Sequence, residues 1–110
     1  MANSGEPFPF RLATQASGDP ALIRISDLIR ERGLDPSTVT VADMFPDDNS
    51  FEFGLVVTDD ARVFQFGYDY LGATRAEGLL SEWNELTNSW RSSPYHEEVA
   101  RALEFRNPAA

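Results

Sequence analysis

The chain has 110 residues, with nine Arg, no Lys, 18 Asp or Glu and one His, so its formal net charge at pH 7 is −9. The absence of Cys excludes thiol nucleophiles, disulfides and zinc ribbons, and the absence of Lys excludes a Walker lysine and Schiff-base chemistry. A chain this acidic repels phosphates, which argues against nucleic acid as a partner.

Residues 1–18 carry two Pro and two Gly, and we expect them to form an irregular N-terminal arm. The segment PFPFRL, residues 7–12, is the exception, because its large apolar residues alternate. Its two prolines cannot donate ladder hydrogen bonds, which limits it to an edge strand or an extended segment docked on the body. No signal-peptide pattern is visible, and no segment approaches the ~20 apolar residues of a membrane span, so we expect a cytoplasmic protein that does not enter a membrane.

A single α+β domain is expected over residues 19–106. It opens with a helix over residues 20–32, because Asp19 and Pro20 have the N-cap and first-position chemistry of a helix start. Gly33 stands where a left-handed residue ends a helix. Apolar residues at helical spacing, including Leu22, Ile25 and Ile29, predict one buried face.

Three runs rich in β-branched and aromatic residues follow, over residues 38–45, 50–58 and 61–71. Turn-forming residues separate them, so the pattern predicts a three-stranded antiparallel meander. Thr74 and Glu77 then have the spacing of a capping box, and apolar residues at helical intervals continue to Trp90. A fourth strand near residues 78–84, with one fewer helix, is the alternative, since Gly78 disfavours a helix.

A last helix is expected to open at Ser93 and Pro94, and residues 107–110 to form a frayed tail. The expected architecture is therefore a two-layer domain: an N-terminal helix, a three-stranded meander, then two helices. The helices are expected to pack together on the aromatic face of the sheet.

The hairpin between the second and third predicted strands carries the clearest pattern. Odd-numbered apolar residues in residues 51–57 and even-numbered aromatics in residues 64–70 share a face only if the connection has an even length. That register pairs Leu55 with Phe64 and Phe53 with Phe66. It places both strand glycines on the reverse face, together with three polar side chains: Gly54, Gly67, Glu52, Gln65 and Asp69. The reverse face is then either a shallow acidic binding groove or a surface packed under another segment of the chain.

Between Arg32 and Arg62 there is no basic residue, and seven acids give this segment a charge of −7. Such a field attracts basic partners, although acidic loops also simply keep small proteins soluble. The predicted binding residues combine the reverse face with the acidic turn of the hairpin: Glu52, Gln65, Asp69, Asp59 and Asp60. The sequence predicts no catalytic residue, no metal ligand and no cofactor, since His96 is the single histidine and no nucleotide-binding, P-loop or hydrolase motif is present.

The aromatic meander with an acidic turn, followed by amphipathic helices, resembles small acidic bacterial proteins, some of which are immunity proteins that block toxins. This resemblance rests on no motif, and it transfers no residue role to this chain. The leading hypothesis is a non-catalytic binding module that meets a basic protein partner, as an inhibitor or immunity-type factor. One alternative is a small-molecule- or metal-dependent enzyme that uses carboxylates such as Glu52 and Asp69. The other is a protein that self-associates through a strand edge or the N-terminal arm.

Overall fold

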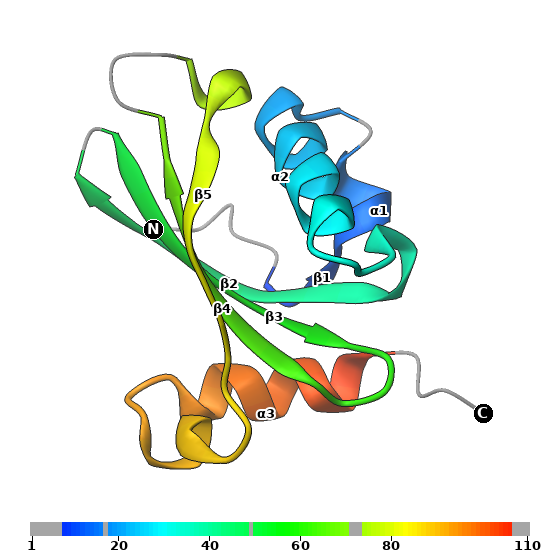
Figure 1. Ribbon diagram of the computed structural model, residues 1–110. Coiled ribbons are helices and arrows are strands. Elements are labelled where there is room, and N and C mark those ends of the chain that lie inside the picture. The colour runs from blue at the N-terminus through cyan, green and yellow to red at the C-terminus, as the bar shows by residue number, and fades with distance from the viewer. Residues whose placement is uncertain (1–7, 17, 49, 71–73, 107–110) are drawn as a thin grey trace.

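A computed structural model describes residues 8–16, 18–48, 50–70 and 74–106 (Figure 1). The chain forms a compact α+β domain around one five-stranded antiparallel sheet with the strand order β1-β2-β3-β4-β5. The strands are β1 (Phe10–Arg11), β2 (Val39–Asp48), β3 (Phe51–Thr58), β4 (Val63–Asp69) and β5 (Leu79–Glu85). The α-helices are α1 (Leu12–Ala16), α2 (Pro20–Glu31) and α3 (His96–Phe105), and the short 3-10 turns are η2 (Pro36–Thr38), η3 (Arg75–Glu77) and η4 (Ser89–Ser92).

Helix α2 confirms the prediction made from its end signals. The Asp19 side chain accepts a hydrogen bond from the Ala21 backbone N–H at 2.9 Å, and Pro20 occupies the first turn. Gly33 follows the helix with a φ of +90°, a conformation that costs glycine little and other residues more. The expected face is buried, including Leu22, Ile25 and Ile29.

The predicted helix over residues 74–90 is wrong, and the fourth-strand alternative is correct. Only η3 and η4 are helical there, and β5 pairs with β4 between them. Gly78 explains the start of the strand, because a Cβ at this position would lie 2.5 Å from the Tyr68 ring. The Gly78 N–H donates to the Tyr68 hydroxyl at 3.1 Å. Pairing with the second edge of β4, which β3 leaves open, therefore outweighs the helical spacing of the apolar residues.

Helices cover both faces of the sheet, so the domain has three layers rather than the predicted two (Figure 1). Helices α1 and α2 pack on one face over a core that includes Phe64, Phe66 and Tyr68. Helix α3 packs on the other face over a smaller core of mainly aliphatic residues, among them Leu55 and Val57. The prediction that all helices share the aromatic face is wrong for α3.

The register of the β3–β4 hairpin differs by one residue from the prediction. Val56 pairs with Phe64, Gly54 with Phe66 and Glu52 with Tyr68, and five residues, 58–62, lie between the last paired residues, Val57 and Val63, instead of an even number. Ala61, with a φ of +70°, supplies the left-handed residue that closes this turn. The odd-numbered residues of β3 therefore face α3, whereas the even-numbered aromatics of β4 face α2. The prediction failed because it assumed one buried face, and both faces are buried.

The two strand glycines lie on opposite faces, and each is covered by an aromatic ring of a neighbouring strand. A Cβ on Gly54 would lie 2.1 Å from the Phe66 ring, and one on Gly67 would lie 2.7 Å from the Phe51 ring. The space above each glycine is therefore filled by the protein itself. The expected pair of glycines beneath one groove does not exist.

The two ends of the described chain are more ordered than predicted at the N-terminal side and as predicted at the C-terminal side. Phe10 pairs with Val41, which confirms the edge strand expected within residues 7–12, whereas residues 12–16 form α1 with Leu12 fully buried, so the irregular arm is wrong for them. Helix α3 begins at His96, close to the predicted start, and buries Val99. The predicted tail, residues 107–110, lies outside the described residues. Among the described residues, no helix has both the length and the apolar character needed to cross a membrane.

Candidate functional site

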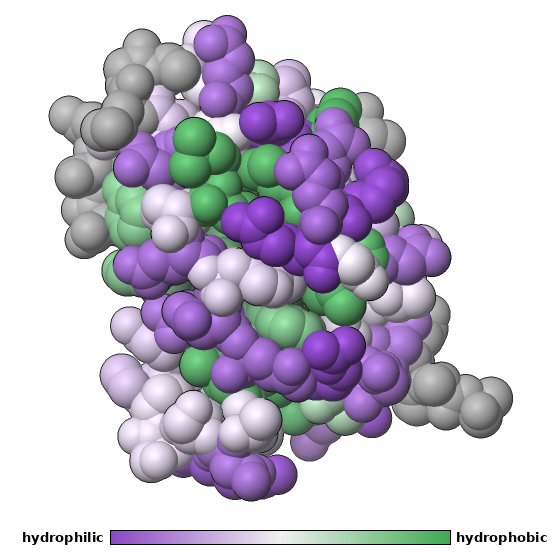
Figure 2. All heavy atoms as spheres, viewed as in Figure 1, coloured by the Kyte–Doolittle hydropathy of each residue, from purple (hydrophilic) through white to green (hydrophobic). Residues whose placement is uncertain are grey.

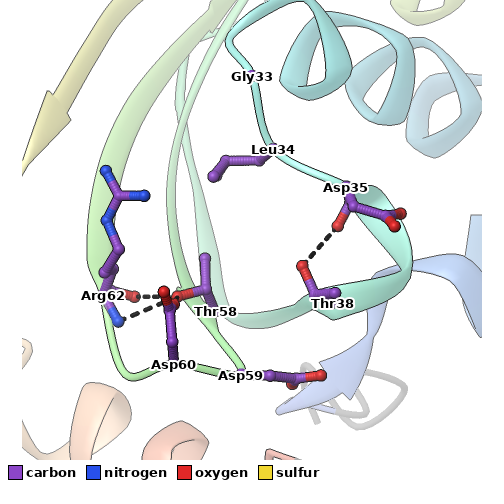
Figure 3. Close-up of a pocket in the computed structure, with 8 residues that line it drawn as sticks. All are labelled: Gly33, Leu34, Asp35, Thr38, Thr58, Asp59, Asp60 and Arg62. Carbon is purple, nitrogen blue, oxygen red and sulfur yellow. Dashed lines mark hydrogen bonds between the residues drawn. The ribbon is translucent and has the colours of Figure 1, made fainter. Parts of the chain in front are cut away.

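A pocket of about 240 Å³ opens between the end of α2 and the β3–β4 turn (Figure 3). It is smaller than the roughly 300–1,000 Å³ of typical small-molecule sites, and it matches a group the size of one side chain. Two segments that are distant in sequence form its walls. The lining residues are Gly33, Leu34, Asp35 and Thr38 on one side, and Thr58, Asp59, Asp60 and Arg62 on the other.

The first wall follows directly from the way α2 ends. Gly33 turns the chain, Leu34 points toward the middle of the pocket, and Asp35 caps η2 (Figure 3). The Asp35 carboxylate accepts hydrogen bonds from the backbone N–H and the hydroxyl of Ser37, at 2.9 and 2.8 Å. These bonds lower the pKa of Asp35 below its usual value of 3.8, the backbone bond most of all, so this exposed carboxylate is charged at neutral pH.

The second wall is the turn that connects β3 to β4. The Thr58 hydroxyl donates to the Asp60 carboxylate and accepts the Arg62 backbone N–H at 3.0 Å. These contacts hold Asp60 at the rim of the pocket, where its side chain is exposed.

Asp59 points away from Asp60 and serves a structural role (Figure 3). Its carboxylate bonds to the Arg11 guanidinium at 2.7 and 3.3 Å, and both side chains are only about one-fifth exposed. Arg11 also bonds to the Thr40 hydroxyl and to the Ser37 carbonyl. The charge of Asp59 is thus balanced within the protein.

Arg62 completes the lining, and its charge is balanced as well. Its guanidinium forms a fork onto Glu85 of β5, with distances of 3.0 and 3.2 Å, and lies 5.0 Å above the centre of the Phe64 ring. The hydrogen bonds raise the pKa of Arg62 and lower the pKa of Glu85. Of the carboxylates that line the pocket, Asp35 and Asp60 are the two that form no ion pair among the described residues.

The structure brings together only two of the five predicted binding residues, since Asp59 and Asp60 line the pocket. Glu52 lies on the α2 face, is 8% exposed, and pairs with Arg75 at 3.1 Å. Gln65 and Asp69 lie on the opposite face, which α3 packs against, as their pairing with Leu55 and Phe51 shows. The predicted acidic groove of Glu52, Gln65 and Asp69 does not form.

Sequence reasoning missed Leu34 and Asp35 as site residues. Asp35 belongs to the acidic segment that the charge count singled out, and it follows a strong helix stop. An acidic residue directly after a helix stop was therefore the sequence feature that could have indicated Asp35 as a site residue. What brings Asp35 to Asp60 is the pairing of β2 with β3, which places the Thr38 carbonyl on the Asp59 N–H at 2.9 Å.

The carboxylates of the alternative enzyme hypothesis do not meet, because Glu52 and Asp69 lie on opposite faces of the sheet. His96 is exposed at the start of α3, with Nδ1 at 3.0 Å from the Ser93 carbonyl oxygen. Within the described part of the chain, no group of three or more His, Asp or Glu side chains has the arrangement of a metal site.

Comparisons of the chain with protein-family models, with curated proteins and with solved structures find no match.

Proposed function

We propose that the protein is a non-catalytic binding module and that it receives a basic protein partner at the pocket between α2 and the β3–β4 turn. The observation that carries this proposal is the exposed Asp60 carboxylate at the rim of a small pocket whose lining also includes Asp35, with the Asp35 carboxylate turned toward Ser37 (Figure 3). Neither Asp35 nor Asp60 forms an ion pair with an arginine among the described residues. A cationic group at the rim would lie beside the Asp60 carboxylate, and the negative charge of Asp35 would add to the attraction.

The arginines of the chain strengthen this argument, because most of them hold the fold together. Four form ion pairs with carboxylates: Arg11, Arg30, Arg62 and Arg75. Three others donate to backbone carbonyls: Arg24, Arg32 and Arg106. With a net charge of −9, the excess carboxylates remain on the surface, and such a surface speeds association with a basic protein.

The shape of the pocket favours a side chain of a protein partner over a larger ligand. Leu34 provides an apolar wall, and the charged groups lie at the rim (Figure 3). An arginine or lysine side chain has the same division, with an apolar stem and a charged end. If the basic surface covered in this way is the partner's functional site, the protein acts as an inhibitor of the immunity type.

The proposal is tested by adding Nα-acetyl-arginine methylamide to ¹⁵N-labelled protein and following the amide resonances. The neutral isostere Nα-acetyl-citrulline methylamide serves as the ligand control. We expect the arginine compound alone to shift resonances of residues 33–35 and 58–60, with shifts that shrink as salt rises. The double variant Asp35→Asn with Asp60→Asn should lose the response and keep its stability within ~0.5 kcal/mol.

A matched variant distinguishes an effect of the pocket carboxylates from an effect of the overall net charge. Glu97→Gln with Glu104→Gln removes the same charge from exposed positions of α3. This control variant should respond like the wild type. An equal loss in both double variants would show that net charge acts without the pocket, and no shift in the wild type would refute the proposal.

A further inference from the structure

Strand β5 is the last strand of the sheet, and half of its backbone groups point away from β4. The Leu86 N–H donates to the Val63 carbonyl at 2.8 Å, in register with the pairs Phe64–Glu85 and Phe66–Trp83. In an antiparallel ladder, residues next to such a bond turn their N–H and C=O groups to the other side. The backbone groups of Trp83 and Glu85 therefore point to the outer edge.

The outer edge of β5 is satisfied at one end and open at the other. Arg24 donates to the Gly78 carbonyl at 2.7 Å, and Arg32 donates to the Leu80 carbonyl at 3.5 Å. Among the described residues, no side chain bonds to the backbone of Trp83 or Glu85. Unpaired N–H and C=O groups in a row form a template for another strand.

The open end of this edge leads to the pocket. Glu85 holds the Arg62 guanidinium, and Arg62 lines the pocket. Beside this ion pair, the Trp83 ring stacks on the Phe64 ring with centroids 4.9 Å apart, and Arg62 covers the same Phe64 ring. Trp83, which is partly buried, and Arg62 thus both contact the buried Phe64 ring, and they lie between the strand edge and the acidic rim.

We propose that the outer edge of β5 pairs with an extended segment of the basic partner, and that this segment continues past Arg62 to place a basic side chain in the pocket. This inference rests on the proposed function, because it assigns the partner's conformation at the same site. Hydrogen bonds to the backbone of Trp83 and Glu85 supply the pairing. The carboxylates of Asp35 and Asp60 select the charge of the inserted side chain.

Charge decides between a basic segment and a second copy of this chain as the occupant. A second copy would carry the same net charge of −9 and would bring its own Glu82 and Glu85 to the shared edge. Like charges on paired strands are destabilising, whereas a basic segment meets the exposed Glu82 favourably. Figure 2 shows that hydrophilic residues dominate the face that carries β5, with hydrophobic residues in smaller patches between them.

The test selects peptides from a random ten-residue display library on the wild-type protein. The selected peptides are then measured against Glu85→Pro, which removes the outward N–H, and Glu85→Ala, which keeps it but also lacks the Arg62 ion pair. We expect enrichment of peptides with Arg or Lys, and binding by Glu85→Pro about tenfold weaker than by Glu85→Ala, since one backbone hydrogen bond and its steric fit are lost.

Hydrogen exchange on the wild-type protein provides a second readout that does not depend on the folding of the proline variant. A bound peptide should slow exchange of the Trp83 and Glu85 amides. Unchanged exchange at both amides, or equal affinity of Glu85→Pro and Glu85→Ala, would overturn the inference. Dimerisation of the free protein that Glu85→Pro abolishes would also overturn it, in favour of a second copy.

The same peptides distinguish failure of this inference from failure of the proposed function. If Asp35→Asn with Asp60→Asn loses binding while Glu85→Pro retains it, the pocket stands and the strand docking is wrong. If the double variant binds as tightly as the wild type, or if no basic peptides are enriched, the proposed function is wrong as well.

Discussion

The two outer edges of the sheet differ in whether their outward backbone groups have hydrogen-bond partners. One edge is formed by β2 with β1, and the other by β5. On the β2 side, Val41 is paired with Phe10 of β1. Further along β2, the Met44 N–H donates to the Asp43 carboxylate at 2.8 Å, and Pro46 has no N–H to offer. On the β5 side, Arg24 and Arg32 bond to the carbonyls of Gly78 and Leu80, and within the described part of the chain the N–H groups of Trp83 and Glu85 have no partner.

The fold therefore protects the β2 edge from pairing with other chains and leaves part of the β5 edge available. Native proteins commonly block an exposed edge with proline, with charged residues or with a covering segment, and β2 uses all three of these devices. An edge left open in the same domain is therefore informative. The open edge, rather than the acidic charge alone, indicates that the partner binds as an extended strand.

We expect the largest effect at Arg11, which lies in β1 and holds this strand against the edge of β2 through its bonds to Asp59 and Thr40. Arg11→Ala removes its bonds to Asp59 and Thr40 and leaves the one-fifth-exposed Asp59 carboxylate without its cation. We expect a loss of about 1.5–3 kcal/mol in the free energy of unfolding, measured by urea denaturation. Arg11→Lys should recover only part of it, because an ammonium cannot form the fork. A loss within the ~0.5 kcal/mol typical of surface substitutions would mean that Arg11 does not hold β1 in place.

We expect a smaller effect in the hydrogen-exchange rates of individual amides on the two edges. In the wild type, the Met44 amide should exchange more slowly than the Trp83 and Glu85 amides, although all three point outward. Asp43→Ala should remove this protection, because the carboxylate is the acceptor of the Met44 N–H. Exchange monitored by NMR checks both statements. Equal rates for the three amides in the wild type would contradict the contrast between a closed and an open edge.

The smallest effect concerns the ion pair beside the open edge. The hydrogen bond from Arg62 lowers the pKa of Glu85 below its usual 4.5, so the pair stabilises the folded state above about pH 4.5. This stabilisation is lost as the pH falls below 4.5 through the lowered pKa. The difference in urea midpoint between the wild type and Glu85→Gln should therefore be present at pH 7, shrink in acid, and be weakened by salt because the pair is exposed. A difference that grows in acid would contradict this assignment.

Residue types and short spacings were enough to predict the features that depend on neighbouring residues. Helix α2 followed from Asp19, Pro20 and Gly33, because caps act within one turn of the chain. The strands of the meander followed from their residue types, and the acidic segment from a count of charges. Two of the pocket residues, Asp59 and Asp60, were reached in the same way.

The features that depend on what covers each element could not be predicted from local patterns, because long-range packing sets them. Residues 79–85 form a strand because they pair with the edge of β4 that β3 leaves open, although their spacing suits a helix. The β3–β4 register shifted by one because α3 buries the second face of the sheet, and alternation reveals a register only when one face is solvated. Asp35 and Asp60 line the same pocket because β2 pairs with β3. Each of these outcomes is a contact between segments distant in sequence, and local patterns carry no information on such contacts.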